Sequence, residues 1–107
     1  MAEKKKAMIS QPMSGLTTEE IKRTKEKALK CLEEKGYEVL NTLFDDEWKN
    51  GQPSDVNSVQ IHFLAKALGV MSKCSAVYFC KGWEQSNGCR IEHATAESYG
   101  LEMVYEE

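Results

Sequence analysis

One short segment of the sequence, Ala76–Cys80 (Ala-Val-Tyr-Phe-Cys), is apolar at every position. Its length and its β-branched and aromatic residues are typical of a β-strand. A strand with one face in water alternates apolar and polar residues, and this one does not, so both of its faces must be covered. Strands of this kind occur mainly in parallel sheets with helices packed on each side. The segment therefore predicts an α/β fold.

The rest of the chain alternates between strands and helices, as such a fold requires. Thr17 and Glu20 form a capping box, which predicts the start of a helix, and Gly36 ends that helix as a C′ glycine. A second helix begins at about Val56 or Asn57 and carries an apolar stripe as far as Met71. The predicted strands are Ala7–Ser10, Tyr37–Leu40, Ala76–Cys80 and Leu101–Tyr105, and the predicted third helix is Asn87–Tyr99.

This alternation predicts a single α/β domain over residues 1–107, a three-layer α/β/α sandwich of the flavodoxin or Rossmann-like type. Residues 1–6 are expected to form a solvated tail. The four strands should be parallel in the order 2-1-3-4, with Ala76–Cys80 central. Ligands of such sheets bind at the carboxyl ends of the strands where the strand order reverses. The loops 11–15 and 81–86 and the start of the third helix should therefore surround one crevice.

The composition excludes several classes of partner. Acidic residues outnumber basic residues 17 to 14, which gives a net charge of −3, whereas nucleic-acid binders usually display a basic face. No apolar run approaches the ~20 residues that span a bilayer. No apolar signal-peptide core follows the basic residues near the start. We therefore expect a cytoplasmic protein without a nucleic-acid or membrane partner.

Four cysteines raise the question of disulfides or a metal site: Cys31, Cys74, Cys80 and Cys89. Disulfides are unfavourable in a reducing cytosol. Cys89 and His93 have the i, i+4 spacing of ligands on one helical face, but no further residues stand at zinc-type spacing. We expect buried or half-buried thiols, no metal and no cofactor.

The segment 41–55 (NTLFDDEWKNGQPSD) interrupts the regular pattern. It mixes the apolar side chains of Phe44 and Trp48 with a run of acidic residues. A loop of this length in a compact domain is usually a lid, a binding loop or an interface.

Glu92 is the first candidate for chemistry. It follows the buried strand and a glycine-containing turn, a place where α/β proteins position site residues. Ile91 and Thr95 are expected to face the sheet, which would put Glu92 near the edge of the buried stripe. The alternative is an ordinary exposed carboxylate on a helix.

The start of the same helix could bind an anion. Ser86, Asn87 and Gly88 offer backbone N–H groups and a hydroxyl, and a helix N-terminus favours negative charge. The alternative is that Ser86 or Asn87 only caps the helix. Trp83 could stack on a base, or it could simply cover the end of the helix.

Three segments form an ordered set of motifs: Ile9–Gly15 (ISQPMSG), Gly82–His93 (GWEQSNGCRIEH) and Ala96–Glu102 (AESYGLE). Together they resemble the nucleoside 2-deoxyribosyltransferase superfamily, and most closely its small branch of bacterial and phage domains of unknown function. Members of that branch carry an "SGPM-TG" start and a "PGW--S-GA--E" core. The resemblance extends over nearly the whole chain.

The resemblance implies cleavage or transfer of the N-glycosidic bond of a (deoxy)nucleoside or its 5′-monophosphate. In characterised relatives the glutamate four residues after the motif glycine is the nucleophile, and Gly88 and Glu92 match that spacing. Ser86 matches the phosphate-binding serine of the deoxynucleoside 5′-monophosphate N-hydrolases, which stands six residues before the glutamate. The implied catalytic residue is Glu92. The implied substrate-binding residues are Ser10, Gln11, Pro12, Met13, Gly15, Gly82, Trp83, Ser86, Asn87 and Gly88.

The resemblance also implies a homo-oligomer, since relatives are dimers or higher oligomers whose sites are completed by a neighbour. The sequence departs from the family pattern in two places. Gln11 stands where a glycine is expected, and Ala67 or Lys66 stands where relatives usually carry an acidic residue in the second helix. Candidate substitutes for that acid are His62, Asp45 and Asp46. Two alternatives to an enzyme stay open: a module that binds a nucleotide derivative without chemistry, and an oligomeric scaffold with a vestigial crevice.

Overall fold

The computed structural model describes residues 4–13, 15–40 and 58–107, and it confirms the four-stranded parallel sheet in the order 2-1-3-4. Each neighbouring pair of strands runs parallel. The strands are β1 (Lys6–Ser10), β2 (Glu38–Val39), β3 (Ala76–Phe79) and β4 (Glu102–Tyr105). The helices are α1 (Thr18–Glu34), α3 (Val59–Met71) and α4 (Asn87–Ser98), with a 3-10 turn, η1 (Trp83–Gln85), before α4.

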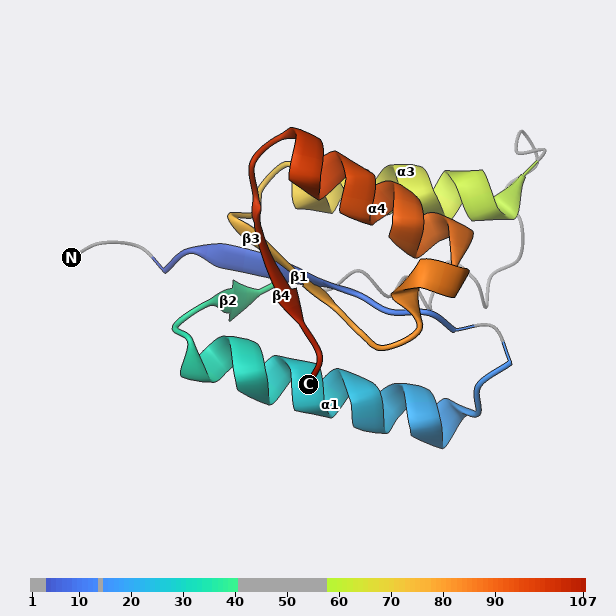
Figure 1. The fold of residues 1–107 in the computed structure, drawn as a ribbon, viewed down its shortest axis with the longest axis horizontal. Helices are drawn as coiled ribbons and strands as arrows, with labels where there is room; N and C mark the ends of the chain where they lie inside the picture. Colours follow the sequence, from blue (N-terminus) through green and yellow to red (C-terminus); the bar gives the residue numbers. More distant parts are fainter. Residues whose placement is uncertain (1–3, 14, 41–57) are drawn as a thin grey trace.

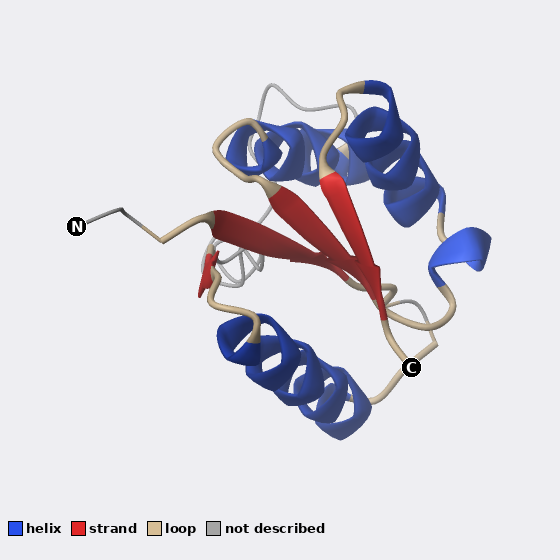
Figure 2. Cartoon of the chain, turned by 60° about the vertical axis from the view of Figure 1, so that its left-hand side comes forward, coloured by secondary structure: helices blue, strands red, loops and turns tan. Residues whose placement is uncertain are grey.

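The helices cover both faces of the sheet. In Figures 1 and 2, α1 lies on one side of the strands, while α3 and α4 lie next to each other on the opposite side. Each crossover between parallel strands thus carries its helix onto one face, as expected for a doubly wound sheet. The predicted three-layer α/β/α architecture is confirmed.

The two central strands, β1 and β3, send alternate side chains into two separate cores. Ala7 and Tyr78 pack with residues of α1, whereas Met8 and Phe79 pack with residues of α3 and α4. All four residues of β3 are buried, so the strand is covered on both faces as its composition predicts. Because successive side chains of a strand alternate between faces, Ser10 lies on the same face as Met8, toward α4.

The signals at the ends of α1 are confirmed. The Thr17 side chain accepts a hydrogen bond from the Glu20 N–H at 3.1 Å, and Gly36 adopts a left-handed conformation (φ +89°) after the helix. The predicted start of the second helix is wrong by two or three residues. Ser58 has an extended backbone and its side chain accepts a hydrogen bond from the Ile61 N–H, so it is the N-cap and α3 begins after it.

The other differences from the predicted elements are small. β1 already includes Lys6, which pairs with Glu38, so the predicted N-terminal tail ends one residue earlier than expected. β2 is only two residues long. Within the described parts of the chain, no helix has the length and apolar character needed to cross a membrane.

Candidate functional site

Glu92 lies on the face of α4 that packs against the sheet. Its side chain is only 8% exposed, and it shares the buried stripe of the helix with Cys89 and Ala96. The expected orientation of α4 is therefore wrong: Ile91 is 45% exposed and Thr95 is half-buried. The i, i+3, i+7 spacing from Cys89 selects positions 89, 92 and 96 as the inward face. The carboxylate thus belongs to the buried stripe itself.

The side chain of Ser10 holds the Glu92 carboxylate. Ser10 ends β1 and is 1% exposed, and its Oγ donates a hydrogen bond to Glu92 Oε1 at 2.7 Å. Burial raises the pKa of Glu92, while the hydrogen bond from Ser10 acts in the opposite direction. A carboxyl group with these properties can exchange a proton at a higher pH than an exposed glutamate, and one hydroxyl stabilises its ionised form.

A cavity of about 410 Å³ lies beside Glu92, between α1, α3 and the start of α4. Its volume falls in the range of small-molecule sites. One part of the wall is polar, and its residues include Gln11, Ser86 and Glu92. The apolar part comes from α1, β2, α3 and the residue after β2: Leu29, Val39, Leu40, Phe63, Leu64 and Ala67. Such a cavity suits a ligand that has both an apolar part and a polar or anionic part.

Five of the predicted site residues line this cavity: Gln11, Met13, Ser86, Gly88 and Glu92. The structure thus brings the loop after β1 and the start of α4 together at the carboxyl end of the sheet. Gln11 is also tied to α1, because its Nε2 donates a hydrogen bond to the Ile21 carbonyl at 2.7 Å.

Ser86, and not Asn87, caps α4. The Ser86 side chain accepts a hydrogen bond from the Cys89 N–H at 3.4 Å, and Ser86 also lines the cavity. Asn87 is exposed, and its side-chain oxygen accepts a hydrogen bond from Arg90. A methyl group placed on Gly88 would meet no atom within 4 Å, so a ligand can come close to the backbone there. The first N–H groups of a helix have no partner inside the helix and favour an anion.

Pro12 and Gly82 lie outside the wall of this cavity. Gly82 has a left-handed backbone (φ +92°), and a Cβ on it would lie 3.5 Å from Pro12 Cγ. A side chain at position 82 would therefore approach the loop that follows β1. Gly15 (φ +79°) supplies a left-handed turn before α1, and Ser14 is outside the described residues.

Trp83 also lies outside the cavity wall. Its ring stacks on His93 (centroid distance 4.0 Å, interplanar angle 9°) and packs against Phe79. The His93 Nε2 makes a 2.7 Å hydrogen bond with the Tyr105 hydroxyl. This arrangement favours the alternative in which Trp83 covers the end of α4.

The Cys89 and His93 side chains, although four residues apart, do not point to one site. Cys89 lines the cavity, whereas His93 belongs to the aromatic cluster with Trp83. Over the described ranges, no three His, Cys, Asp or Glu side chains are grouped so that they could hold a metal ion.

The four cysteines carry free thiols. Burial raises the pKa of Cys74 to about 11 and that of Cys80 to about 12. Burial also raises the pKa of Cys89, while hydrogen bonding with Ser10 and Ser86 works against that shift. Thiols with raised pKa values are weak nucleophiles at neutral pH.

Two polar residues of the cavity wall, Lys25 on α1 and Gln60 on α3, were not predicted from the sequence as site residues. Lys25 forms no hydrogen bond or ion pair with any residue that the structure describes. The sequence does contain a signal for Lys25. It stands one helical turn before Leu29 and therefore shares a face with the apolar stripe.

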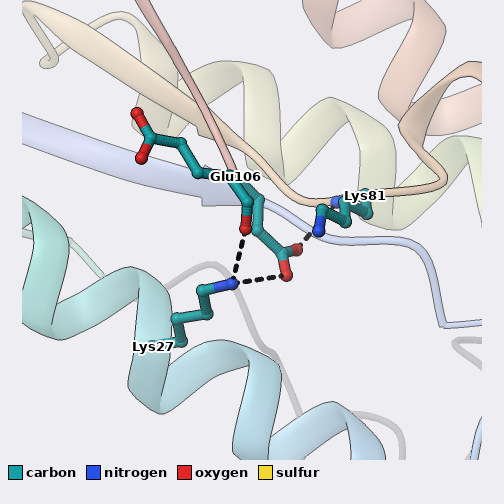
Figure 3. Close-up of polar contacts among 4 residues, drawn as sticks. Lys27, Lys81 and Glu106 are labelled. Carbon is teal, nitrogen blue, oxygen red and sulfur yellow. Dashed lines mark hydrogen bonds and ion pairs between the residues drawn. The ribbon is translucent and has the colours of Figure 1, made fainter.

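A polar clamp fixes the loop that connects β3 to α4. The Glu106 carboxylate accepts hydrogen bonds from the Lys81 N–H at 2.8 Å and from Lys27 Nζ at 3.3 Å (Figure 3). Lys27 Nζ also donates to the Glu107 carbonyl at 2.7 Å. Burial alone would raise the pKa of Glu106, but the bonds from Lys81 and Lys27 outweigh it, and the pKa is lowered. The clamp joins α1, the end of the chain and the loop before the site.

The predictions for Phe44, Asp45, Asp46 and Trp48 concern positions outside the described residues. The homo-oligomer that the resemblance implies stays a prediction. Size-exclusion chromatography with mass measurement would contradict it if the protein were monomeric at micromolar concentration.

A family model described as "Domain of unknown function (DUF4406)" matches residues 5–105. Neither a search of curated proteins nor a search of solved structures found a match. The matched range includes all four strands, the three described helices and every residue that lines the cavity beside Glu92. The chain that folds around this buried carboxylate therefore belongs to the DUF4406 family.

Proposed function

We propose that this protein is a nucleoside 2-deoxyribosyltransferase-like N-glycosidase that acts on a (deoxy)nucleoside 5′-monophosphate. One observation carries the proposal: the buried carboxylate of Glu92 borders a 410 Å³ cavity beside the open start of α4. Retaining glycosidases use a carboxylate as their nucleophile, and here a carboxylate borders a cavity of mixed polarity. The motif resemblance assigns the same residue to that role.

The proposed reaction has two steps. A Glu92 oxygen forms a bond to C1′ while the C1′–N bond breaks, and the electron pair leaves with the base, which takes up a proton from solvent. Water or a second base then attacks C1′ of the glycosyl-enzyme ester. The Glu92 carboxylate is released, and the attacking group loses its proton. Both transition states resemble an oxocarbenium ion, which the adjacent carboxylate stabilises.

The start of α4 is the proposed phosphate site. Ser86 and Gly88 line the cavity, and the N-terminus of a helix favours an anion through its first N–H groups and its dipole. The apolar wall formed by residues such as Leu29 and Phe63 would receive the base. Lys25 could pair with a second charged or polar group of the ligand.

The test is release of free base from a panel of deoxynucleoside and ribonucleoside 5′-monophosphates. We expect release by the wild type and a loss of at least about 10³-fold in Glu92→Gln, because removing a nucleophile costs most of the chemical acceleration. Glu97→Gln is the matched control, since Glu97 is an exposed acid of the same helix. Equal release by wild type and Glu92→Gln would refute the proposal, as would no release from any member of the panel.

A second candidate is a module that binds a nucleotide derivative without turnover. The resemblance places the usual acid of the second helix at position 66 or 67, where this chain has Lys66 and Ala67, and Ala67 lines the cavity without supplying a carboxylate. Thermal-shift measurements separate the two candidates. Stabilisation by a nucleotide without release of base supports the module, and no stabilisation by any nucleotide leaves only the scaffold.

A further inference from the structure

The Ser10 hydroxyl contacts the Glu92 carboxylate, but Ser10 does not line the cavity. The serine is 1% exposed and is absent from the cavity wall, whereas Glu92 belongs to that wall. The resemblance implies a contact between Ser10 and the substrate. In this structure the hydroxyl instead contacts Glu92, at 2.7 Å.

The sheet fixes the backbone of Ser10. Ser10 is paired with Phe79 of β3, and its carbonyl accepts a hydrogen bond from the Cys80 N–H at 3.0 Å. Its side chain has a single torsion between the backbone and the hydroxyl oxygen. The hydroxyl is therefore a rigid point of the sheet, and it restrains a long side chain that comes from α4, 82 residues later in the sequence.

We propose that Ser10 is a positioning residue for Glu92, whose hydroxyl holds Oε1 so that Oε2 is presented to the cavity for attack on C1′. The inference rests on the proposed function, in which Glu92 is the nucleophile. The same hydrogen bond serves both steps. It fixes the attacking carboxylate, and it stabilises the carboxylate again when the glycosyl-enzyme ester is cleaved.

Few other groups near Glu92 could hold its carboxylate in place. The other titratable side chains that line the cavity are Cys89 from α4 and Lys25 from α1. The side chains that α3 contributes to the wall are uncharged: Gln60, Phe63, Leu64 and Ala67. On the sheet below α4, Val77 and Phe79 are apolar. Burial and the Ser10 hydroxyl are accordingly the two causes that shift the pKa of Glu92.

The experiment compares wild type with Ser10→Ala and Ser10→Cys, and uses Ser75→Ala at an exposed position as the control. Carbon-13 NMR titration of the Glu92 carboxyl group reports the contact directly. The pH profile of kcat/KM for base release reports its effect on turnover.

In Ser10→Ala we expect the Glu92 titration and the acidic limb of the profile to move to higher pH. We also expect kcat to fall by about 10- to 100-fold with little change in KM, the range for losing one hydrogen bond to a charged group. Ser75→Ala should match the wild type.

An unchanged Glu92 titration and an unchanged acidic limb in Ser10→Ala would overturn the inference, even if that variant were less stable. If Ser10→Ala does not fold, Ser10→Cys decides the question, because a thiol of similar size is a weaker donor and should move both readouts in the same direction. If the wild type releases no base, the proposed function fails by itself. The NMR titration then shows whether Ser10 still controls the carboxyl group, and an unmoved titration refutes the positioning role as well.

Discussion

A double-mutant cycle on Ser10 and Glu92 measures how strongly β1 and α4 are coupled through this one contact. The variants are Ser10→Ala, Glu92→Met and the double variant, in which methionine keeps the length of the side chain without its charge. The two oxygens are 2.7 Å apart, and the residues are 1% and 8% exposed, so little water competes for the bond. Hydrogen bonds to charged groups contribute about 1.5–3 kcal/mol. We expect a coupling energy of about 2 kcal/mol, within that range.

The assay is urea unfolding of the four proteins at about pH 8 and about pH 4, because the Glu92 carboxyl group is more ionised at the higher pH. At the lower pH the bond joins two neutral groups, so the coupling should fall to about 1 kcal/mol. Each single variant leaves one buried polar group without its partner, whereas the double variant removes both groups. The double variant should therefore be more stable than the sum of the two single effects implies. A coupling below about 0.5 kcal/mol at both pH values would show that Ser10 does not restrain Glu92.

Three further predictions use other parts of the structure. Glu92→Gln should have a higher free energy of unfolding than the wild type at about pH 8. This difference in free energy should shrink toward about pH 4. A carboxyl whose folded pKa is raised contributes stability below its unfolded pKa near 4.5 and loses that contribution as the pH rises. Equal pH dependence of the unfolding free energies would refute this. Glu106→Gln should lower the free energy of unfolding by about 1 kcal/mol or less at neutral pH, because Lys27, one of the two partners of Glu106, is 53% exposed. That loss should disappear as the pH falls from 4.5 through the lowered folded pKa of Glu106, and Glu107→Gln, which keeps the backbone carbonyl, is the control. Ala67→Leu should fill part of the cavity and abolish nucleotide-induced thermal stabilisation. It should leave the free energy of unfolding unchanged or raise it by about 1–2 kcal/mol, given about 0.8 kcal/mol per buried CH₂ less the lost rotamer freedom. A destabilised variant would mean that the space beside Ala67 is already filled.

The fold was predictable because its signals are local and agree with one another. The apolar run at 76–80 required two covering layers, and the Thr17 cap and the glycine at position 36 marked the ends of α1. The order of the strands then followed from the general rules for parallel crossovers. The start of α3 was less predictable, because Asp55, Asn57 and Ser58 can all cap a helix and only the backbone geometry selects Ser58.

The candidate site was predictable in part. Glu92 and Ser86 follow from the motif and from their place after a central strand. The rotation of α4 did not follow, because a short helix with apolar residues on more than one side permits more than one buried face. The bond between Ser10 and Glu92 joins positions 82 residues apart and depends on that rotation. Trp83 was ambiguous for the same reason, since its environment depends on His93 and Tyr105, which reach it only in the folded chain.

A search for the covalent intermediate on Glu92 tests the proposed nucleophile most directly. Wild type, Glu92→Gln and Glu97→Gln would each be mixed with deoxynucleoside 5′-monophosphates, quenched in acid during turnover and analysed by peptide mass spectrometry. If Glu92 is the nucleophile, the peptide that contains Glu92 carries a deoxyribosyl-phosphate adduct in the wild type and in Glu97→Gln and lacks it in Glu92→Gln. Release of base without any adduct on that peptide, at a rate that Glu92→Gln retains, would contradict that role.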